Sequence, residues 1–115
     1  MDNSLKESLD HANKMKVFNN QLRLLKEKYL ERNIHFTVGH QFTIDLQLIN
    51  YCITLKNQNK IKDVIMLDDY DLPVRIDDLQ SFYDNIMDLY QQNLNAYIVE
   101  YNKLVQDKGL SLIHI

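Results

Sequence analysis

The chain has 115 residues, with 13 Lys and Arg against 16 Asp and Glu, one Cys, one Pro and two Gly. A hydrophobic content of 45% with 25% charged residues is typical of one globular domain, and it excludes a disordered tail or a disulfide scaffold. So few glycines nearly exclude phosphate-binding glycine loops. A net charge of −3 gives no electrostatic reason to bind nucleic acid or an anionic membrane, and we expect neither as a partner.

The sequence also limits the compartment. The single cysteine, Cys52, cannot form an intramolecular disulfide, and the first residues, MDNSLKESLD, lack the apolar stretch of a signal peptide. No apolar run approaches the ~20 residues that a membrane helix needs. We therefore expect a protein that is made and kept in cytosol-like conditions.

A long amphipathic helix is predicted at the N-terminus. Ser4 and Glu7 have the spacing of a capping box, and Asn33 tolerates the left-handed conformation found at helix ends. A helix of about 28 residues is roughly 42 Å long, whereas a domain of this size has a radius of gyration of about 13 Å. We expect residues 1–33 to project as a candidate coiled coil or to pack along another long helix. The apolar residues, spaced by three and four, are Leu5, Leu9, Ala12, Met15, Phe18, Leu22, Leu25 and Tyr29.

After residue 33 the apolar period changes to two, which predicts a β-hairpin over residues 34–44. A two-residue turn would pair Val38 with Gln41 and mix apolar and polar faces. We therefore expect a three-residue turn that pairs Val38 with Phe42 and Phe36 with Ile44.

A short helix is predicted next. Asp45 can cap its first turn, and the polar stretch from Lys56 to Lys62 ends it. The residues expected on its apolar face are Leu46, Ile49, Cys52 and Ile53. Because no His or other base lies near Cys52 in the sequence, we expect this cysteine to be a small buried hydrophobe.

A second hairpin is predicted over residues 65–76, with the acidic residues 68–71 as its turn. A four-residue loop pairs Leu67 with Leu72 and Ile65 with Val74, so that the apolar faces agree. Pro73 lacks a backbone donor, which predicts that the returning strand lies at a sheet edge.

The last predicted element is a helix of about 30 residues that begins at Asp77, with Gln80 in the reciprocal capping position, and ends at Lys108-Gly109. The apolar residues 110–115 behind it are suited to extending a sheet edge. The order long helix, hairpin, short helix, hairpin, long helix defines an α+β fold. Residues 34–115 are expected to form a compact hairpin–helix–hairpin core with the long C-terminal helix.

No residue pattern predicts catalysis or a metal site. An EF-hand loop beginning at Asp68 would need Gly and Glu where the chain has Pro73 and Leu79, so we expect a solvated acidic turn. His35 and His40 flank the tip of the first hairpin on its less apolar face, but a zinc site needs at least three convergent ligands. No Ser, Cys or Thr has a base at a spacing that would predict nucleophilic catalysis. We expect a non-enzymatic protein without a cofactor.

Both long helices carry a seam with coiled-coil spacing. The seam of the last helix drifts at Glu100, and Asn93 is suited to setting its register, as a buried Asn does in coiled coils. Two alternatives stay open: the helices pack on each other within one subunit, or they form a seam between subunits of a homo-oligomer. The candidate interface residues are Met15, Phe18, Leu22, Leu25, Tyr29, Tyr83, Tyr90, Asn93 and Tyr97.

Two stretches of the chain combine several recognisable features. FTVGHQFTID is a hairpin followed by a short helix, and VIMLDDYDLPVRIDDLQSF joins an acidic turn, a Pro-Val strand, a capping Asp-Leu-Gln and a long helix. With these motifs, residues 36–104 resemble a small uncharacterised domain of tail, tail-fibre and other virion-associated proteins of tailed bacteriophages. In that domain the turn often reads Ala-Asp-Asn with a Trp upstream, whereas this chain has no Trp.

The resemblance implies a structural or assembly role with protein partners, and it transfers no catalytic residues. Our first hypothesis is a component of a phage virion, associated with the tail, a fibre or the connector and assembled in the host cytoplasm. The alternative is an assembly chaperone or adaptor that is absent from the mature particle. A regulator that binds nucleic acid is a third hypothesis, and the acidic balance of the chain argues against it.

Overall fold

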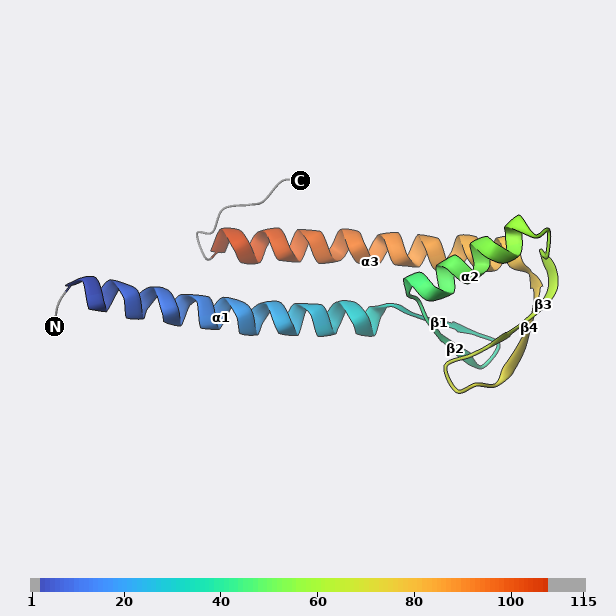
Figure 1. Cartoon of the computed structure of the whole chain (residues 1–115), viewed down its shortest axis with the longest axis horizontal. Coiled ribbons are helices and arrows are strands. Elements are labelled where there is room, and N and C mark those ends of the chain that lie inside the picture. Colours follow the sequence, from blue (N-terminus) through green and yellow to red (C-terminus); the bar gives the residue numbers. More distant parts are fainter. Residues whose placement is uncertain (1–2, 108–115) are drawn as a thin grey trace. The chain divides into compact units, whose positions relative to one another are not determined.

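The computed structural model describes residues 3–107, and the predicted α+β order of elements is confirmed (Figure 1). The elements are α1 (Asn3–Arg32), β1 (Ile34–Thr37), β2 (His40–Thr43), α2 (Leu46–Asn57), β3 (Lys62–Leu67), β4 (Pro73–Asp78) and α3 (Leu79–Asp107). The helix end predicted at Lys108-Gly109 and the sheet-edge segment predicted at 110–115 lie outside the described residues.

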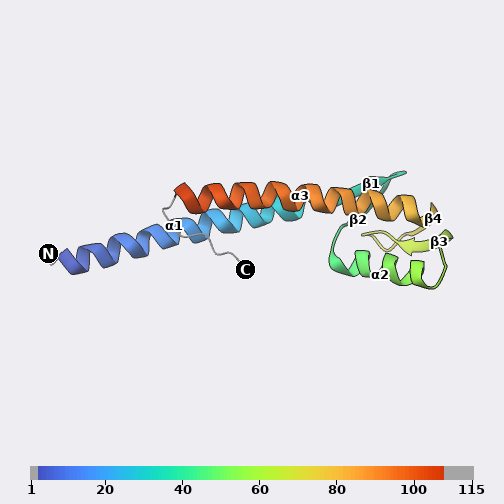
Figure 2. The same ribbon diagram turned by 90° about the horizontal axis from the view of Figure 1, so that it is seen from above.

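The chain divides into two compact units. The first, which we call the helical unit, comprises residues 1–29 and 95–115, and the second, the mixed unit, comprises residues 30–94. In the helical unit, α1 and α3 run side by side in opposite directions (Figure 1, Figure 2). The mixed unit contains α2, the first turns of α3 and both hairpins, each of which is a separate two-stranded antiparallel sheet.

The helical unit buries only part of the seam predicted on α1. Phe18 is 8% exposed, but Leu5 and Leu9 are 52% and 47% exposed. The contacts Tyr29–Tyr97 and Lys28–Glu100 set an antiparallel alignment in which the end of α3, at Asp107, lies beside the middle of α1, so the N-terminal half of α1 extends past it (Figure 1). The half-buried members of the seam are Met15, Leu22, Leu25 and Tyr29.

The mixed unit has one continuous apolar core, to which α2, both hairpins and the start of α3 contribute. Leu79, Phe82 and Ile86 form one face of α3, since they are three and four residues apart. The rings of Phe82 and Phe42 meet edge to face, with their centroids 5.2 Å apart. The remaining buried members are Ile44, Ile49, Cys52, Leu55, Met66, Val74 and Ile76.

The first hairpin has a two-residue turn, so the predicted three-residue turn is wrong. Thr37 pairs with His40, and the turn residues Val38 and Gly39 both have positive φ, 48° and 79°. Two positive φ values belong to the tight turn whose twist matches that of the flanking strands. The geometry of this turn therefore sets the register, and it leaves Phe36 and Val38 69% and 92% exposed.

The second hairpin is also shifted from its predicted register, because Met66 and not Ile65 lies opposite Val74. Its loop runs from Asp68 to Leu72 and is closed by two hydrogen bonds. The Asp68 N–H donates to the Leu72 carbonyl at 2.9 Å, and the Leu72 N–H donates to the Asp68 carboxylate at 2.9 Å. As a result Met66 faces the core, and Ile65 is 53% exposed.

Helix α2 begins as predicted, since the Asp45 carboxylate accepts the Leu48 N–H at 2.9 Å. Its predicted apolar face is partly wrong: Leu46 and Ile53 are 62% and 37% exposed. The buried face of α2 instead consists of residues spaced by three, which are Ile49, Cys52 and Leu55.

Helix α3 begins at Leu79, and its cap lies one residue later than predicted, at Asp78 and not at Asp77. Asp78 caps it: one carboxylate oxygen accepts the Gln80 N–H at 3.1 Å, and the other accepts the Ser81 hydroxyl at 2.9 Å. These hydrogen bonds hold the pKa of Asp78 below its usual value. Asp77 continues strand β4 instead.

Candidate interaction sites

In the helical unit, two of the candidate interface residues contact each other. The rings of Tyr29 and Tyr97 lie 5.1 Å apart, and Tyr101 stacks on Tyr97 at 6.3 Å. Burial first, and then the neighbouring tyrosines, raise the pKa of Tyr97. Beside this cluster, Lys28 Nζ lies 3.2 Å from Glu100 Oε1. The tyrosine seam is thus an internal contact between α1 and α3 of one chain.

Two other candidates, Tyr83 and Tyr90, pack against the core of the mixed unit. Lys56 Nζ lies 4.2 Å from the centroid of the Tyr83 ring, so a cation covers part of this side chain as well. Packing within one chain therefore accounts for the buried face of the seam. A homo-oligomer stays a prediction.

The side chain of Asn93 forms hydrogen bonds at the C-terminal end of α1. Its Nδ2 donates to the Arg32 carbonyl and to Asn33 Oδ1, both at 2.8 Å, and the side chains of Asn93 and Asn33 are buried. The Arg32 carbonyl is one of the helix-end acceptors that no helical N–H can satisfy. Asn33 does not adopt the predicted left-handed conformation. Its backbone N–H donates to the Leu30 carbonyl at 3.2 Å, and its carbonyl accepts the Ile44 N–H at 2.7 Å.

The acidic turn joins the two hairpins, and the prediction of a solvated turn is wrong for Asp68, which is 6% exposed. Asp68 Oδ2 lies 2.7 Å from His40 Nδ1. Asp69 accepts the N–H and the hydroxyl of Thr43, both at 2.8 Å, and the amide of Gln41 at 3.0 Å. We call these five residues the acidic clasp. Sequence reasoning missed it because its partners come from a different hairpin.

Hydrogen bonding favours the charged form of the Asp68 carboxylate. The bond to His40 is the largest cause that lowers the pKa of Asp68, and the N–H groups of Leu72 and Tyr70 lower it further, against an opposing effect of burial. The one signal in the sequence is that Asp binds backbone N–H groups two residues ahead in turns, as Asp68 does with Tyr70 at 2.8 Å.

The two histidines of the first hairpin share a face with the buried Phe42, whereas the predicted three-residue turn places Phe42 on the opposite face. His35 lies opposite Phe42 in the ladder, and its ring meets Phe82 edge to face at 5.8 Å. Burial lowers the pKa of His35. The cause is the two-residue turn, which aligns His35 and Thr37 of β1 with Phe42 and His40 of β2.

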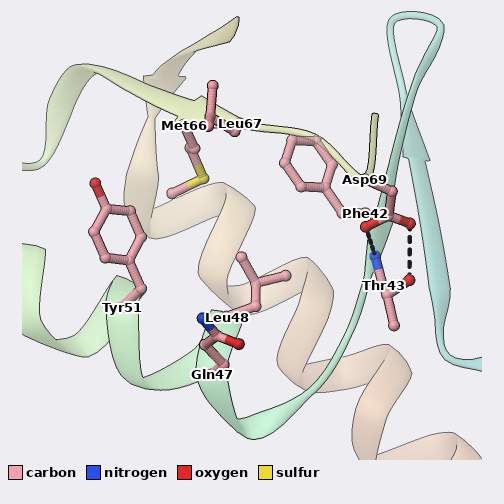
Figure 3. A pocket seen from close by; sticks show the side chains of 8 residues that line it. All are labelled: Phe42, Thr43, Gln47, Leu48, Tyr51, Met66, Leu67 and Asp69. Carbon is pink, nitrogen blue, oxygen red and sulfur yellow. Dashed lines mark hydrogen bonds between the residues drawn. The ribbon is translucent and has the colours of Figure 1, made fainter. Parts of the chain in front are cut away.

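A pocket of about 260 Å³ opens between α2, the end of β2 and β3 (Figure 3). Three donors already occupy the Asp69 carboxylate at its rim. At this volume the pocket fits an apolar side chain, and it is smaller than the ~300 Å³ at which ligand sites begin. Its lining residues are Phe42, Thr43, Gln47, Leu48, Tyr51, Met66, Leu67 and Asp69.

Neither a metal site nor a reactive thiol is found among the described residues. In residues 3–107, no group of three His, Cys, Asp or Glu side chains can hold a metal ion. Cys52 is fully buried, and burial raises the pKa of its thiol to about 11, so the sulfur stays protonated at neutral pH. No helix in the same part of the chain is long and apolar enough to cross a membrane.

Comparison with known proteins gives no match to a family model, a curated protein or a solved structure. The likeness to the phage domain therefore rests on the sequence motifs of residues 36–104.

Proposed function

We propose that this protein is a non-enzymatic structural component of a bacteriophage virion, associated with the tail, a fibre or the connector. It attaches to neighbouring proteins through the helical unit. The observation that carries the proposal is the N-terminal half of α1, where every residue from Asn3 to Lys14 is exposed. The phage-like motifs of residues 36–104 support the choice of assembly.

The exposed half of α1 has the chemistry of a protein contact. Leu5 and Leu9 lie one turn apart and are each about half exposed. Covering the rest of each side chain would contribute about 1 kcal/mol. The flanking residues Lys6, Glu7 and Asp10 carry charges of both signs, as the rim of a protein interface does. An isolated helix shorter than about 12–15 residues is marginal in water, so a partner would also stabilise it.

Quantitative mass spectrometry of purified particles tests this function. Wild-type protein should be present in mature virions. The double variant Leu5→Asp/Leu9→Asp should be depleted about tenfold, since two buried carboxylates cost far more than the 1.4 kcal/mol that a tenfold change represents. The matched control is Asn3→Asp/His11→Asp, which adds the same two carboxylates on the opposite side of the helix. Absence of the wild-type protein from virions would contradict the structural role.

The same measurement tests the alternative function, an assembly chaperone or adaptor. The thin apolar contact of the helical unit favours it, because a helix pair with few buried side chains exchanges partners readily. This alternative requires the protein to be abundant in the infected lysate and absent from the particles.

Light scattering on the purified protein decides which faces of α1 join subunits. If the protein is an oligomer through its seam, Leu22→Asp dissociates it, and Leu24→Asp, at a position that is 50% exposed, does not. A wild-type protein that is already a monomer restricts the seam to packing between α1 and α3.

A further inference from the structure

The outer edge of strand β4 has free backbone groups. The Asp68 N–H donates to the Leu72 carbonyl at 2.9 Å, which makes this residue pair a hydrogen-bonded one. Hydrogen-bonded and non-hydrogen-bonded pairs alternate along an antiparallel ladder, so Arg75, opposite Ile65, belongs to a non-hydrogen-bonded pair. The N–H and the carbonyl of Arg75 therefore point away from β3. The alternation does not extend to Asp77, because the Leu79 N–H donates to the Ile61 carbonyl at 2.9 Å, which changes the phase of the hydrogen-bonded pairs beyond Asp63.

Pro73 belongs to the same set, because it lies opposite Leu67 in the next non-hydrogen-bonded pair. Its missing N–H would have faced outward, so it costs the ladder no bond, and its carbonyl points outward with the others. Among the described residues, no element other than β3 hydrogen-bonds to the backbone of Pro73, Arg75 or Asp77. This edge of the sheet is open.

A groove follows this edge, formed by two adjoining hollows of about 350 and 230 Å³. Consecutive residues of β4, Pro73 to Asp77, line the larger hollow together with Thr37, Val38 and His40. Since successive side chains of a strand point to opposite faces, a hollow lined by consecutive residues meets the edge of β4 and not one face. The tip of the first hairpin forms the opposite wall, so an extended chain in the groove can pair with β4.

The other edge of the sheet is blunted. Asp63 of β3 has a φ of 52°, which interrupts the extended conformation that pairing needs. At the opposite end, the Asp69 N–H is already bonded to the Gln41 carbonyl at 2.9 Å. Only β4 combines an open edge with a groove.

Val38 marks the groove independently. It lines both hollows, its side chain is 92% exposed, and its φ is 48°. A β-branched residue rarely adopts positive φ, and such a conformation costs of order 1–3 kcal/mol. Asn or Gly would fit the turn better and would expose no apolar surface. The strained, exposed valine is explained if its side chain contacts a partner in the groove.

Charge defines the chemistry of that partner. The mixed unit carries ten Asp and Glu against five Lys and Arg. Between Asp63 and Asp88, Arg75 is the sole cation among eight aspartates. A segment that carries Lys or Arg complements this surface, whereas an acidic one is repelled.

We propose that the outer edge of β4 binds an extended, basic segment of a partner protein by strand addition. The backbone of Pro73 and Arg75 supplies the hydrogen bonds, and Val38 contacts the side chains of the added strand. This contact uses other residues than the exposed half of α1, and it is open to test on the purified protein whether or not the protein belongs to a virion.

The test measures the fluorescence anisotropy of a labelled peptide, Lys-Val-Lys-Val-Lys-Val-Lys, titrated with the full-length protein. Arg75→Pro removes the outward N–H without breaking the β3–β4 ladder, and its matched control Ile65→Pro removes the outward N–H opposite it, on the other edge. We expect Arg75→Pro to weaken binding about tenfold and Ile65→Pro to leave it unchanged. Arg75→Ala, which keeps the N–H and removes a positive charge, should bind at least as tightly as the wild type.

A second peptide and a second measurement keep the test independent of how well the proline variants fold. The peptide with N-methylated valines keeps its charge but loses donors, and it should bind about tenfold more weakly. Amide hydrogen exchange of the wild-type protein should slow at Arg75 when the unmodified peptide binds, and stay unchanged at Ile65.

Equal binding of the two peptides, or unchanged exchange at Arg75, would overturn the proposal. So would a failure of the unmodified peptide to bind. Self-association without peptide that Arg75→Pro abolishes would overturn it too, because the occupant would then be a second copy of this chain.

Discussion

The two units of this protein differ in how their apolar side chains are used. The mixed unit gathers buried residues from α2, both hairpins and the start of α3 into one continuous core. In the described part of the helical unit, Phe18 and Val105 are the only apolar side chains that are buried. The same unit also has the ring contacts Tyr29–Tyr97 and Tyr97–Tyr101 and the Lys28–Glu100 ion pair.

This difference predicts that the two units differ in stability. A continuous core stabilises the mixed unit and fixes the β4 edge and the acidic clasp in place. The helical unit has few buried contacts, and segments of that kind open at a lower free energy than a core does. A surface that must order itself on a partner is expected in such a segment.

The same substitution in each unit gives the largest contrast. Phe42 is 2% exposed inside the core, and Phe18 is 8% exposed on α1. Phe42→Ala should lower the free energy of unfolding by about 3–5 kcal/mol, because it leaves a cavity that a dense core cannot close. Phe18→Ala should cost about half as much, since the thin helical contact can collapse around the gap.

Urea unfolding followed by far-ultraviolet circular dichroism measures both values. Equal losses for the two variants would remove the contrast between the units. An unchanged urea dependence of the free energy would show that each variant alters stability and not the extent of unfolding.

Asn93 tests a polar contact inside the mixed unit. Asn93→Ala removes the donor that the Arg32 carbonyl and Asn33 Oδ1 share, and it leaves two acceptors without that partner. We expect a loss of about 1–3 kcal/mol by urea unfolding. Gln92→Ala, the exposed neighbour on the same helix, should change stability by less than about 0.5 kcal/mol. Similar losses for both variants would mean that Asn93 contributes only helix propensity.

The cap of α2 gives a smaller effect. Asp45→Ala removes the acceptor of the Leu48 N–H and should cost about 1 kcal/mol, whereas Asp45→Asn keeps a capping oxygen and should cost a few tenths. The comparison uses the urea midpoint of each variant. If Asn destabilises as much as Ala, the charge of Asp45 and not its hydrogen bond matters.

The elements of the fold were predictable from the sequence because each has a local signal. Helical spacing indicated α1 and α3, and Asp45 marked the start of α2 by its own side chain. The strand registers were not predictable from apolar alternation. A tight turn with positive φ at Val38 and Gly39 sets one register, and Asp68 sets the other by closing its loop onto Leu72.

The candidate sites follow the same division between local and distant signals. Pro73 indicated an edge strand from its chemistry alone, and the structure makes β4 an edge. The acidic clasp joins residues 40–43 to residues 68–69, and no local pattern records a contact over that separation. The partner of Asn93, at the end of α1, was equally invisible in a heptad pattern that suggested a coiled-coil position.

The smallest expected effect is the dependence of stability on pH that Asp68 of the acidic clasp causes. The pKa of Asp68 in the folded protein lies below its ordinary value of 3.8, so folding favours the charged carboxylate. Its stabilisation is complete above the ordinary pKa and is lost as the pH falls through the lowered folded pKa. The urea midpoint of the wild type should therefore hold from neutral pH to about pH 5 and fall below about pH 4.

Asp68→Asn should lower the urea midpoint at neutral pH and reduce its fall in acid, because one of the two carboxylates with a lowered pKa is gone and Asp78 remains. Asp71→Asn changes an exposed side chain of the same turn and should keep the wild-type profile. Amide exchange would locate the loss: Thr43 and Leu72 should exchange faster in acid before the helical seam at Tyr29 does. If the seam opens first, the clasp does not hold the two hairpins together, and the helical unit is the acid-sensitive part of the chain.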